Sequence, residues 1–227
     1  MNTPAHLLLG LAAFGRKDAR SVSWPAAAGA LLPHLSLYVL AGTSLFILGI
    51  SPQRVFDELY FSDSWQAVFA VDNCFVIWGL VLALCLWLRW LPGVAFAGAG
   101  LLHLLLDFAL HHDDARRHFF PVSDWVWESP LSYWDSAHHA GWVAPIGALA
   151  AVVAGGLLWT RHQGIAMRAL LVALVAAELW VLRQWVMFFY SISRLIAFAC
   201  LPERVVLRKR CLAETAKCTH PIDRDML

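Results

Sequence analysis

The sequence predicts an all-α polytopic membrane protein, a bundle of about five transmembrane helices with a short N-terminal half-span helix. Two observations predict this fold class. The first is composition: 60% of the 227 residues are hydrophobic and 15% are charged, whereas a soluble domain carries about 25% charged residues. The second is the length of the apolar runs, because a helix needs about 17 to 25 apolar residues to cross a bilayer. The mean hydropathy of +0.62 agrees with both.

Five runs have the length of a membrane span: 26–49, 73–91, 93–110, 142–160 and 166–190. The N-terminal run, residues 4–14, is too short to cross at roughly 1.5 Å per residue, so we expect a half-span or re-entrant helix packed against the others. Pro92 and Gly93 predict a tight turn between the second and third spans. We therefore expect a membrane helix bundle over 1–190.

Basic residues indicate which span ends face the cytoplasm. They lie before the first span, after the second and between the fourth and fifth: Arg16, Lys17, Arg20, Arg89, Arg161 and Arg168. By the positive-inside rule these ends are cytoplasmic, and the acidic, aromatic-rich loops 51–73 and 111–141 face outward together. The chain is then a multi-pass protein of the plasma membrane.

The C-terminal segment 191–227 does not fit this alternation. It carries seven Lys or Arg against four acids, yet an odd number of spans places it outside. Either the span count is wrong or the segment lies along the inner surface. "RVVLRKR" at 204–210 is typical of a basic segment that favours anionic lipid, so we expect a basic amphipathic or disordered tail.

Several functional classes are excluded. A net charge of +1 argues against nucleic acid as a partner, because a phosphate-binding surface needs a clear basic excess. The five cysteines form no CxxC pair and predict neither a disulfide framework nor a thiolate zinc site; they are Cys74, Cys85, Cys200, Cys211 and Cys218. No nucleophile elbow, phosphate loop or dinucleotide fingerprint is present.

Ionisable side chains inside the apolar runs point to a metal. His103 and Asp107 are four residues apart and share one helix face, and His103 is about ten residues, roughly 15 Å, into its predicted span. His34 follows Pro33, and His6 lies in the N-terminal run. A charged residue inside a membrane costs roughly 2.5 to 3.5 kcal/mol unless it is partnered. Imidazole and carboxylate are zinc ligands, so His6, His34, His103 and Asp107 predict a divalent metal site; the alternative is that each only packs helices through a backbone hydrogen bond.

The segment "HHDDARRH", residues 111–118, supplies candidate catalytic groups at the mouth of this site. His111 and His118 are seven residues apart, so a continuing helix would align them with Asp107. The expected roles are general base for Asp113 or Asp114, general acid for His111 or His118, and binding of an anionic group for Arg116. The alternatives are a solvated charged turn, and pairing of Arg116 and Arg117 with the two aspartates. In the fifth span Glu178 is a lone carboxylate, for which Arg183 is a candidate partner.

These motifs carry a resemblance to a known family. "MNTPAHLLLG" with His6, "GALLPHLSLY" at 29–38 and "HLLLDFALHHDDARRHFFPVSDW" at 103–125 resemble the bacterial family of predicted inner-membrane metal-dependent hydrolases, over roughly residues 1–145. Members usually have Asp after the Pro of the second motif, where this chain has His34. The HxxxD pattern with an N-terminal His is also similar to zinc-dependent phospholipases C, which implies a phosphoester substrate. Some relatives carry a cobalamin-biosynthesis label.

The leading hypothesis is a membrane-embedded hydrolase in the bacterial inner membrane. It would use a divalent ion, with zinc expected, to activate water, and would act on a lipid or lipid-linked ester or phosphoester near the interface. One alternative is a transport or metal-handling protein, in which the same residues form a relay. Another is a non-catalytic membrane scaffold, in which they only pack helices.

Overall fold

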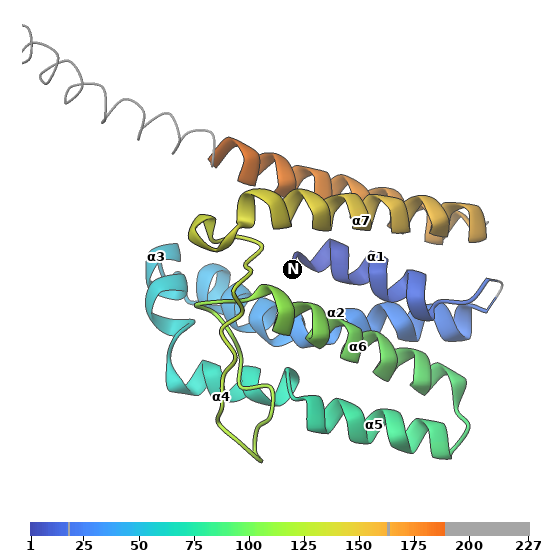
Figure 1. Ribbon diagram of the computed structural model, residues 1–227, viewed down its shortest axis with the longest axis horizontal. Coiled ribbons are helices and arrows are strands. Elements are labelled where there is room, and N and C mark those ends of the chain that lie inside the picture. Colours follow the sequence, from blue (N-terminus) through green and yellow to red (C-terminus); the bar gives the residue numbers. More distant parts are fainter. Residues whose placement is uncertain (18, 163, 189–227) are drawn as a thin grey trace, which may run out of the picture. The chain divides into compact units, whose positions relative to one another are not determined.

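The computed structural model describes residues 1–17, 19–162 and 164–188, which are mainly helical and contain no strand. Five helical segments are long and apolar enough to cross a membrane: Arg20–Ile47 (α2, Arg20–Gly42, extended by the π-helical η1, Thr43–Ile47), Asp63–Trp87 (α4, Asp63–Asp72, and α5, Phe75–Trp87), α6 (Leu91–Leu110), α7 (Ala140–Arg161) and the helix Ile165–Phe188 (Figure 1). The predicted all-α bundle with five spans is confirmed. Residues Met1–Trp185 form one compact unit, and the predicted tail lies outside the described residues.

The short N-terminal helix α1, Thr3–Phe14, lies inside the bundle. It begins with Pro4 in its first turn and packs against α2, α6 and α7 (Figure 1). Ala5, Leu8 and Leu11 are fully buried. The expected half-span helix packed against the others is therefore confirmed.

Small residues bring the helices of the bundle unusually close. A Cβ added at Gly29 of α2 would lie 1.9 Å from the carbonyl oxygen of Phe96 on α6, and one at Gly10 of α1 would lie 2.7 Å from Cβ of Ala30. Glycine and alanine permit this backbone approach, which is how helices associate where no hydrophobic driving force acts between them. The three helices that carry the predicted metal ligands are thus held side by side.

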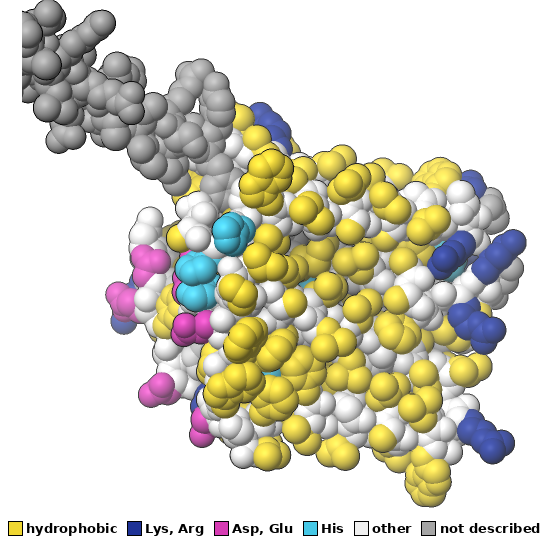
Figure 2. All heavy atoms as spheres, viewed as in Figure 1, with side chains coloured by type: hydrophobic (Ala, Val, Ile, Leu, Met, Phe, Trp, Pro, Cys, Tyr) yellow, Lys and Arg dark blue, Asp and Glu magenta, His cyan; other side chains and the backbone are white. Residues whose placement is uncertain are grey.

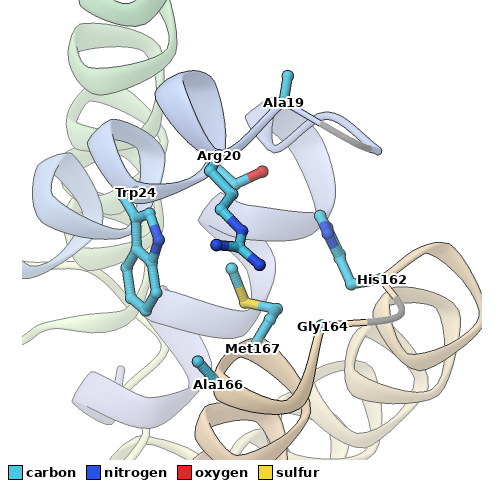
Figure 3. Close-up of a pocket in the computed structure, with 8 residues that line it drawn as sticks. Ala19, Arg20, Trp24, His162, Gly164, Ala166 and Met167 are labelled. Carbon is cyan, nitrogen blue, oxygen red and sulfur yellow. The ribbon is translucent and has the colours of Figure 1, made fainter.

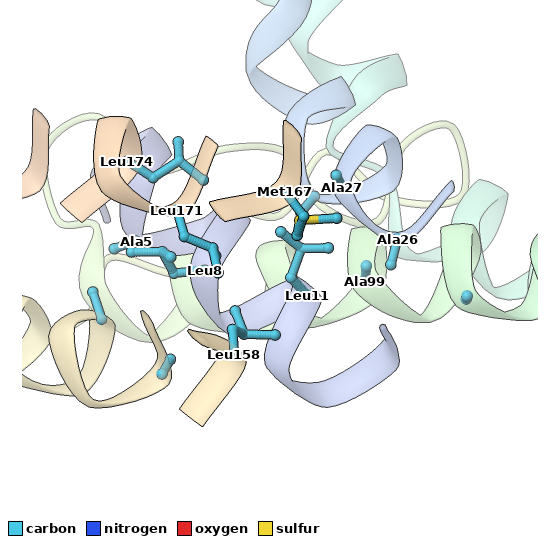
Figure 4. Packing of buried hydrophobic residues seen from close by; sticks show 14 of the residues in the cluster. Ala5, Leu8, Leu11, Ala26, Ala27, Ala99, Leu158, Met167, Leu171 and Leu174 are labelled. Carbon is cyan, nitrogen blue, oxygen red and sulfur yellow. The ribbon is translucent and has the colours of Figure 1, made fainter. Parts of the chain in front are cut away.

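An apolar core fills the bundle beneath the predicted site. Leucines of α1, alanines of α2 and α6, and leucines of α7 and Ile165–Phe188 form one buried cluster, which includes Leu8, Leu11, Ala26, Ala99, Leu158 and Leu171 (Figure 4). Its members pack directly against one another.

The second span starts earlier than predicted and contains a break. The predicted run 73–91 matches α5, Phe75–Trp87, but the observed span also includes α4, which ends at Asp72. The loop that follows α6 satisfies the backbone at the break: the Phe75 N–H donates to the His118 carbonyl (2.8 Å), and the Cys74 thiol donates to the Phe120 carbonyl (2.6 Å). Non-helical backbone at membrane depth requires such partners.

Two connections also differ from the prediction. The segment 51–73, expected to be a loop, is largely helical and contains α3 (Pro52–Arg54), the π-helical η2 (Val55–Leu59) and α4. The turn between α5 and α6 falls at 88–90, where Arg89 has a φ of 53°. Pro92 and Gly93 instead lie in the first turn of α6, where proline needs no backbone donor.

Charged side chains separate to the two ends of the bundle. Figure 2 shows most of the visible Lys and Arg at one end and the acidic and His side chains at the opposite end, with hydrophobic side chains between them. The same separation underlies the predicted sidedness, in which the basic ends face the cytoplasm. The long connection from α6 to α7, which holds the 3-10 turn η3 (Ser136–His138), lies at the acidic end (Figures 1 and 2).

Candidate metal centre

The structure brings the four predicted metal ligands together. His6, His34, His103 and Asp107 each offer one ligand atom, and these atoms all lie within 4.8 Å of one another. The Nε2 atoms of the histidines approach the carboxylate of Asp107 at 2.9 Å (His6), 3.5 Å (His34) and 3.0 Å (His103). His6, His103 and Asp107 are buried, and the His34 side chain is 17% exposed.

Three helices supply these ligands. His6 lies in the first half of α1, His34 follows the internal Pro33 of α2, and His103 and Asp107 lie one turn apart on the buried face of α6. His103 is seven residues from the end of α6, which places it about 10 Å below the acidic end of that helix. The centre is therefore nearer to the acidic end of the bundle than to the basic end.

The hydrogen bond of His103 defines which of its nitrogens is free. Its Nδ1 lies 2.6 Å from the Ala30 carbonyl, which can only accept, so Nδ1 carries the proton. In the neutral ring Nε2 then presents a lone pair to Oδ2 of Asp107, 3.0 Å away. Two acceptors at this distance repel each other unless a proton or a metal ion lies between them. The donor set of the site therefore fits a metal ion.

The rings of the ligand group pack closely around Asp107. The His103 ring stacks on His6 with centroids 3.6 Å apart and 7° between the planes, and meets His34 edge-on at 4.4 Å. The Met1 amino group is a positive charge beside this group, 2.7 Å from Oδ1 of Asp107.

Hydrogen bonds from outside the ligand group orient a second histidine. Nδ1 of His34 lies 2.7 Å from Thr3 Oγ1, which in turn lies 2.5 Å from the Tyr38 hydroxyl. When Thr3 accepts from Nδ1, Nε2 of His34 is also left to face Asp107. Metal-ligating histidines usually donate their other N–H in this way.

His111 occupies a different place from the one that its spacing suggested. Its Nε2 lies 3.1 Å from Oδ1 of Asp107, and its Nδ1 lies 2.8 Å from Oδ2 of Asp114. The side chain thus links the metal centre to Asp114, one of the two expected catalytic carboxylates. Burial alone would raise the pKa of Asp114, but hydrogen bonding to His111 and the nearby charges of His111 and Arg116 hold that pKa below its usual value.

A cavity of about 230 Å³ opens beside the metal centre. Its lining combines predicted site residues with three tyrosines and an apolar wall: Met1, Asn2, Thr3, Pro4, His34, Leu37, Tyr38, Tyr60, His111, Asp114, Arg116, Tyr133 and Val181. Sequence reasoning missed the tyrosines and Thr3. Tyr38 could have been predicted, because it lies four residues after His34 on the same helix face.

Arg116 is fixed at the wall of this cavity by neutral partners. Its guanidinium donates to the Tyr60 hydroxyl and to Oε1 of Gln66 (3.3 Å), and it lies over the rings of Tyr60 (4.8 Å) and Phe69 (4.5 Å). Burial raises the pKa of Tyr60 to about 12, so Tyr60 is a neutral phenol at physiological pH.

Other predicted catalytic residues do not reach the cavity. His118 is buried between Phe75 and Phe108 and donates from Nδ1 to the Asn73 carbonyl (2.8 Å); burial holds its pKa below the usual value. Asp113 is exposed and does not line the cavity. Of the two candidate general bases Asp114 lines the cavity, and of the two candidate general acids His111 does.

Two further expectations concern side chains outside the site. Arg117 pairs with Asp124 (3.3 Å) and not with the aspartates before it. Glu178 is buried and accepts from Asn2 Nδ2 (3.2 Å), whereas its candidate partner Arg183 lies over the ring of Trp180.

A second cavity of about 450 Å³ lies between the start of α2 and the start of the helix Ile165–Phe188. Arg20 points into it between Trp24 and His162 (Figure 3). Arg20 is fourteen residues before His34, or roughly 20 Å along α2. The described lining residues include no carboxylate, so this cavity is not the candidate metal centre.

Comparison with known proteins adds no relative to this description. No protein-family model, no curated protein and no solved structure matches the chain. The fold and the His and Asp group thus carry the functional argument without support from a homologue.

Proposed function

We propose that this protein is a metal-dependent hydrolase embedded in the bacterial inner membrane, which acts on a lipid or lipid-linked ester or phosphoester. One observation carries the proposal: the free Nε2 of His103 and the carboxylate of Asp107 face each other at 3.0 Å in a buried site, with His6 and His34 beside them. Such an arrangement of acceptors calls for a cation. The five helices that are long and apolar enough to cross a membrane support the location in a membrane.

Zinc is the metal that the donor set favours. Three imidazoles and one carboxylate are nitrogen and oxygen ligands of the kind that zinc takes in enzymes. A bound zinc ion would supply Lewis acidity and lower the pKa of water at the site. His6, His34, His103 and Asp107 would hold it, and the cavity next to His34 would admit water and substrate.

Asp114, His111 and Arg116 would act on the substrate side. Asp114 lines the cavity and can accept a proton at a carboxylate oxygen. His111 lies between Asp114 and Asp107, where its imidazole can pass a proton to a leaving group. Arg116 presents fixed N–H donors that can orient an anionic group.

The core beneath the centre favours a hydrolase over a transport protein. A transport route would need polar groups along the membrane depth, but the cluster around Leu8, Leu11 and Ala99 is apolar and closely packed (Figure 4). The scaffold alternative leaves the repulsion between His103 and Asp107 unexplained.

Metal content and metal-dependent turnover test the proposal. Detergent-purified protein is expected to hold about one zinc ion per chain by elemental analysis, and His103→Ala is expected to lose it because a direct ligand is removed. The matched control is His112→Ala, since His112 lies in the same region but stacks on His138 and not on the ligand group. Turnover is measured on a panel of ester and phosphoester lipids.

Chelation is expected to abolish turnover and added zinc to restore it. His112→Ala should keep both the metal and the turnover. Wild-type protein that is monodisperse yet binds no divalent ion, or that turns over its substrate equally after chelation, would refute the proposed function.

A further inference from the structure

We infer that Arg116 and Tyr60 form a phosphoryl-binding subsite in the cavity beside the metal centre, so that the substrate class is a phosphoester. This inference deepens the proposed function and rests on it for the identity of the reaction. The subsite itself is defined by residues that are separate from the four proposed metal ligands. It can therefore be tested by binding as well as by turnover.

Arg116 forms no ion pair with a carboxylate among the described residues, although the charge of Asp114 lies nearby. In the part of the chain that the structure describes, arginine ion pairs are formed by Arg54 with Glu58 and by Arg117 with Asp124. Arg116 contacts a phenol, an amide and two aromatic rings instead. These partners fix the planar guanidinium without neutralising its charge, which can therefore still bind an anion in the cavity.

Tyr60 supplies a second donor to the same place. Arginine cannot accept a hydrogen bond, so in the contact between them Arg116 donates and the Tyr60 oxygen accepts. The phenolic hydrogen is then left for another acceptor, and none is present among the described residues. Because both residues line the cavity, a phosphoryl oxygen there would receive donors from the guanidinium and from the phenol.

The charge of the whole cavity also suits an anion. With a divalent ion bound, the formal charges of that ion, of Arg116 and of the Met1 amino group exceed those of Asp107 and Asp114 by two. A phosphoryl group with its negative charge would balance this excess, whereas a cationic substrate would add to it.

Part of the cavity lining is apolar and adjoins exposed side chains of α2. Pro4, Leu37 and Val181 form this part, and Tyr38 and Val39 of α2 are more than half exposed beside it. An acyl chain can lie along such a surface while its headgroup reaches Arg116. The phosphoryl group that binds there comes either from such a lipid or from a free phosphate compound, and the experiment separates the two sources.

Isothermal titration calorimetry on the detergent-purified full chain tests the subsite, with inorganic phosphate as the first probe. Saturable binding is expected for the wild type. Arg116→Ala should weaken it at least about 20-fold, in line with the loss of charged hydrogen bonds, and Tyr60→Phe about threefold to tenfold for one neutral donor. Arg117→Ala is the matched control, because Arg117 already pairs with Asp124, and should bind within twofold of the wild type.

A second arm uses dihexanoyl phosphatidate, with dihexanoylglycerol as the probe that has the same chains and no phosphoryl group. Phosphatidate that binds at least about tenfold tighter than inorganic phosphate assigns the subsite to lipid headgroups. Equal affinities assign it to free phosphate compounds. Dihexanoylglycerol that binds as tightly as phosphatidate would contradict phosphoryl recognition.

Elemental analysis of the same samples separates this inference from the proposed function. Arg116→Ala should keep the metal content of the wild type, because Arg116 is not a ligand. Phosphate binding that depends on Arg116 in metal-free protein would support the subsite even if the wild type holds no metal. Wild-type protein that binds no phosphate in either form, or an Arg116→Ala variant that binds it as the wild type does, would overturn the inference.

Discussion

Asp107→Asn is expected to lower the affinity of the protein for zinc by more than 100-fold while the helix bundle stays folded. Asp107 is the one carboxylate in the ligand group, and the Nε2 atoms of His6 and His103 lie 2.9 and 3.0 Å from its two oxygens. Asparagine keeps the shape of the side chain but loses its negative charge. Loss of an outer partner of a metal ligand costs about 10- to 100-fold, so the loss of a ligand should exceed that range.

Competition with a chromogenic chelator measures this change, and Asp113→Asn is its control. Asp113 is exposed and does not line the cavity, so its variant should bind zinc within twofold of the wild type. Zinc should also raise the thermal midpoint of the wild type and not that of Asp107→Asn, because a ligand stabilises only the state that binds it. An Asp107→Asn variant that holds zinc as tightly as the wild type would place the metal elsewhere.

The membrane fold could be predicted because it depends on local properties of the chain. Span length follows from the run of apolar residues, and the five predicted runs overlap the five observed helices. The pairing of His103 with Asp107 follows from the helical period alone. His6 and His34 could be proposed because an imidazole inside an apolar run needs a partner, and not because their distance from α6 could be calculated.

The residues that surround the cavity could not be predicted, because they depend on where helices end. His111 and His118 would share one face only if α6 continued, but α6 ends at Leu110 and His111 is extended, with φ −117° and ψ 134°. His118 is consequently directed to the break at Asn73, where it donates to the backbone. Tyr60 reaches Arg116 from a part of the chain 56 residues away, and no local pattern indicates that contact.

The break in the second span shows the same limit. The predicted run 73–91 matches α5 and omits α4, because hydropathy does not reveal the break between these two helices. Its cause is tertiary: the carbonyl of Asp72 accepts from the Trp78 indole (2.7 Å), and the thiol of Cys74 accepts the Ile77 N–H that begins α5. The loop 118–120 completes the hydrogen bonds at this break. The break therefore cannot be recognised from the sequence around residues 72–78 alone.

Gly29→Ala is expected to destabilise the protein by about 3 kcal/mol, the upper part of the range for overpacking a core. The new Cβ would lie 1.9 Å from the carbonyl oxygen of Phe96 and 2.7 Å from its carbonyl carbon. Both are backbone atoms, so α2 and α6 must move apart by roughly 1 Å before ordinary contact is restored. For a chain of this size the thermal midpoint should fall by roughly 6 to 12 °C.

Gly42→Ala is the matched control, because it makes the same substitution in the same helix. No heavy atom lies within 4 Å of a Cβ placed at Gly42, and alanine is favoured over glycine inside a helix by up to about 1 kcal/mol. Its thermal midpoint should therefore equal or exceed that of the wild type. A Gly29→Ala variant as stable as Gly42→Ala would contradict the close packing of α2 on α6.

The same substitution connects the packing of the helices to the chemistry of the site. His34 lies on α2, whereas His103 and Asp107 lie on α6, so a shift of α2 increases the distance from His34 Nε2 to the carboxylate, which is 3.5 Å. Gly29→Ala should consequently bind zinc at least about tenfold more weakly, even at temperatures where it is fully folded. If it lost stability but kept the zinc affinity of the wild type, His34 would not be a ligand, and the centre would consist of His6, His103 and Asp107 alone.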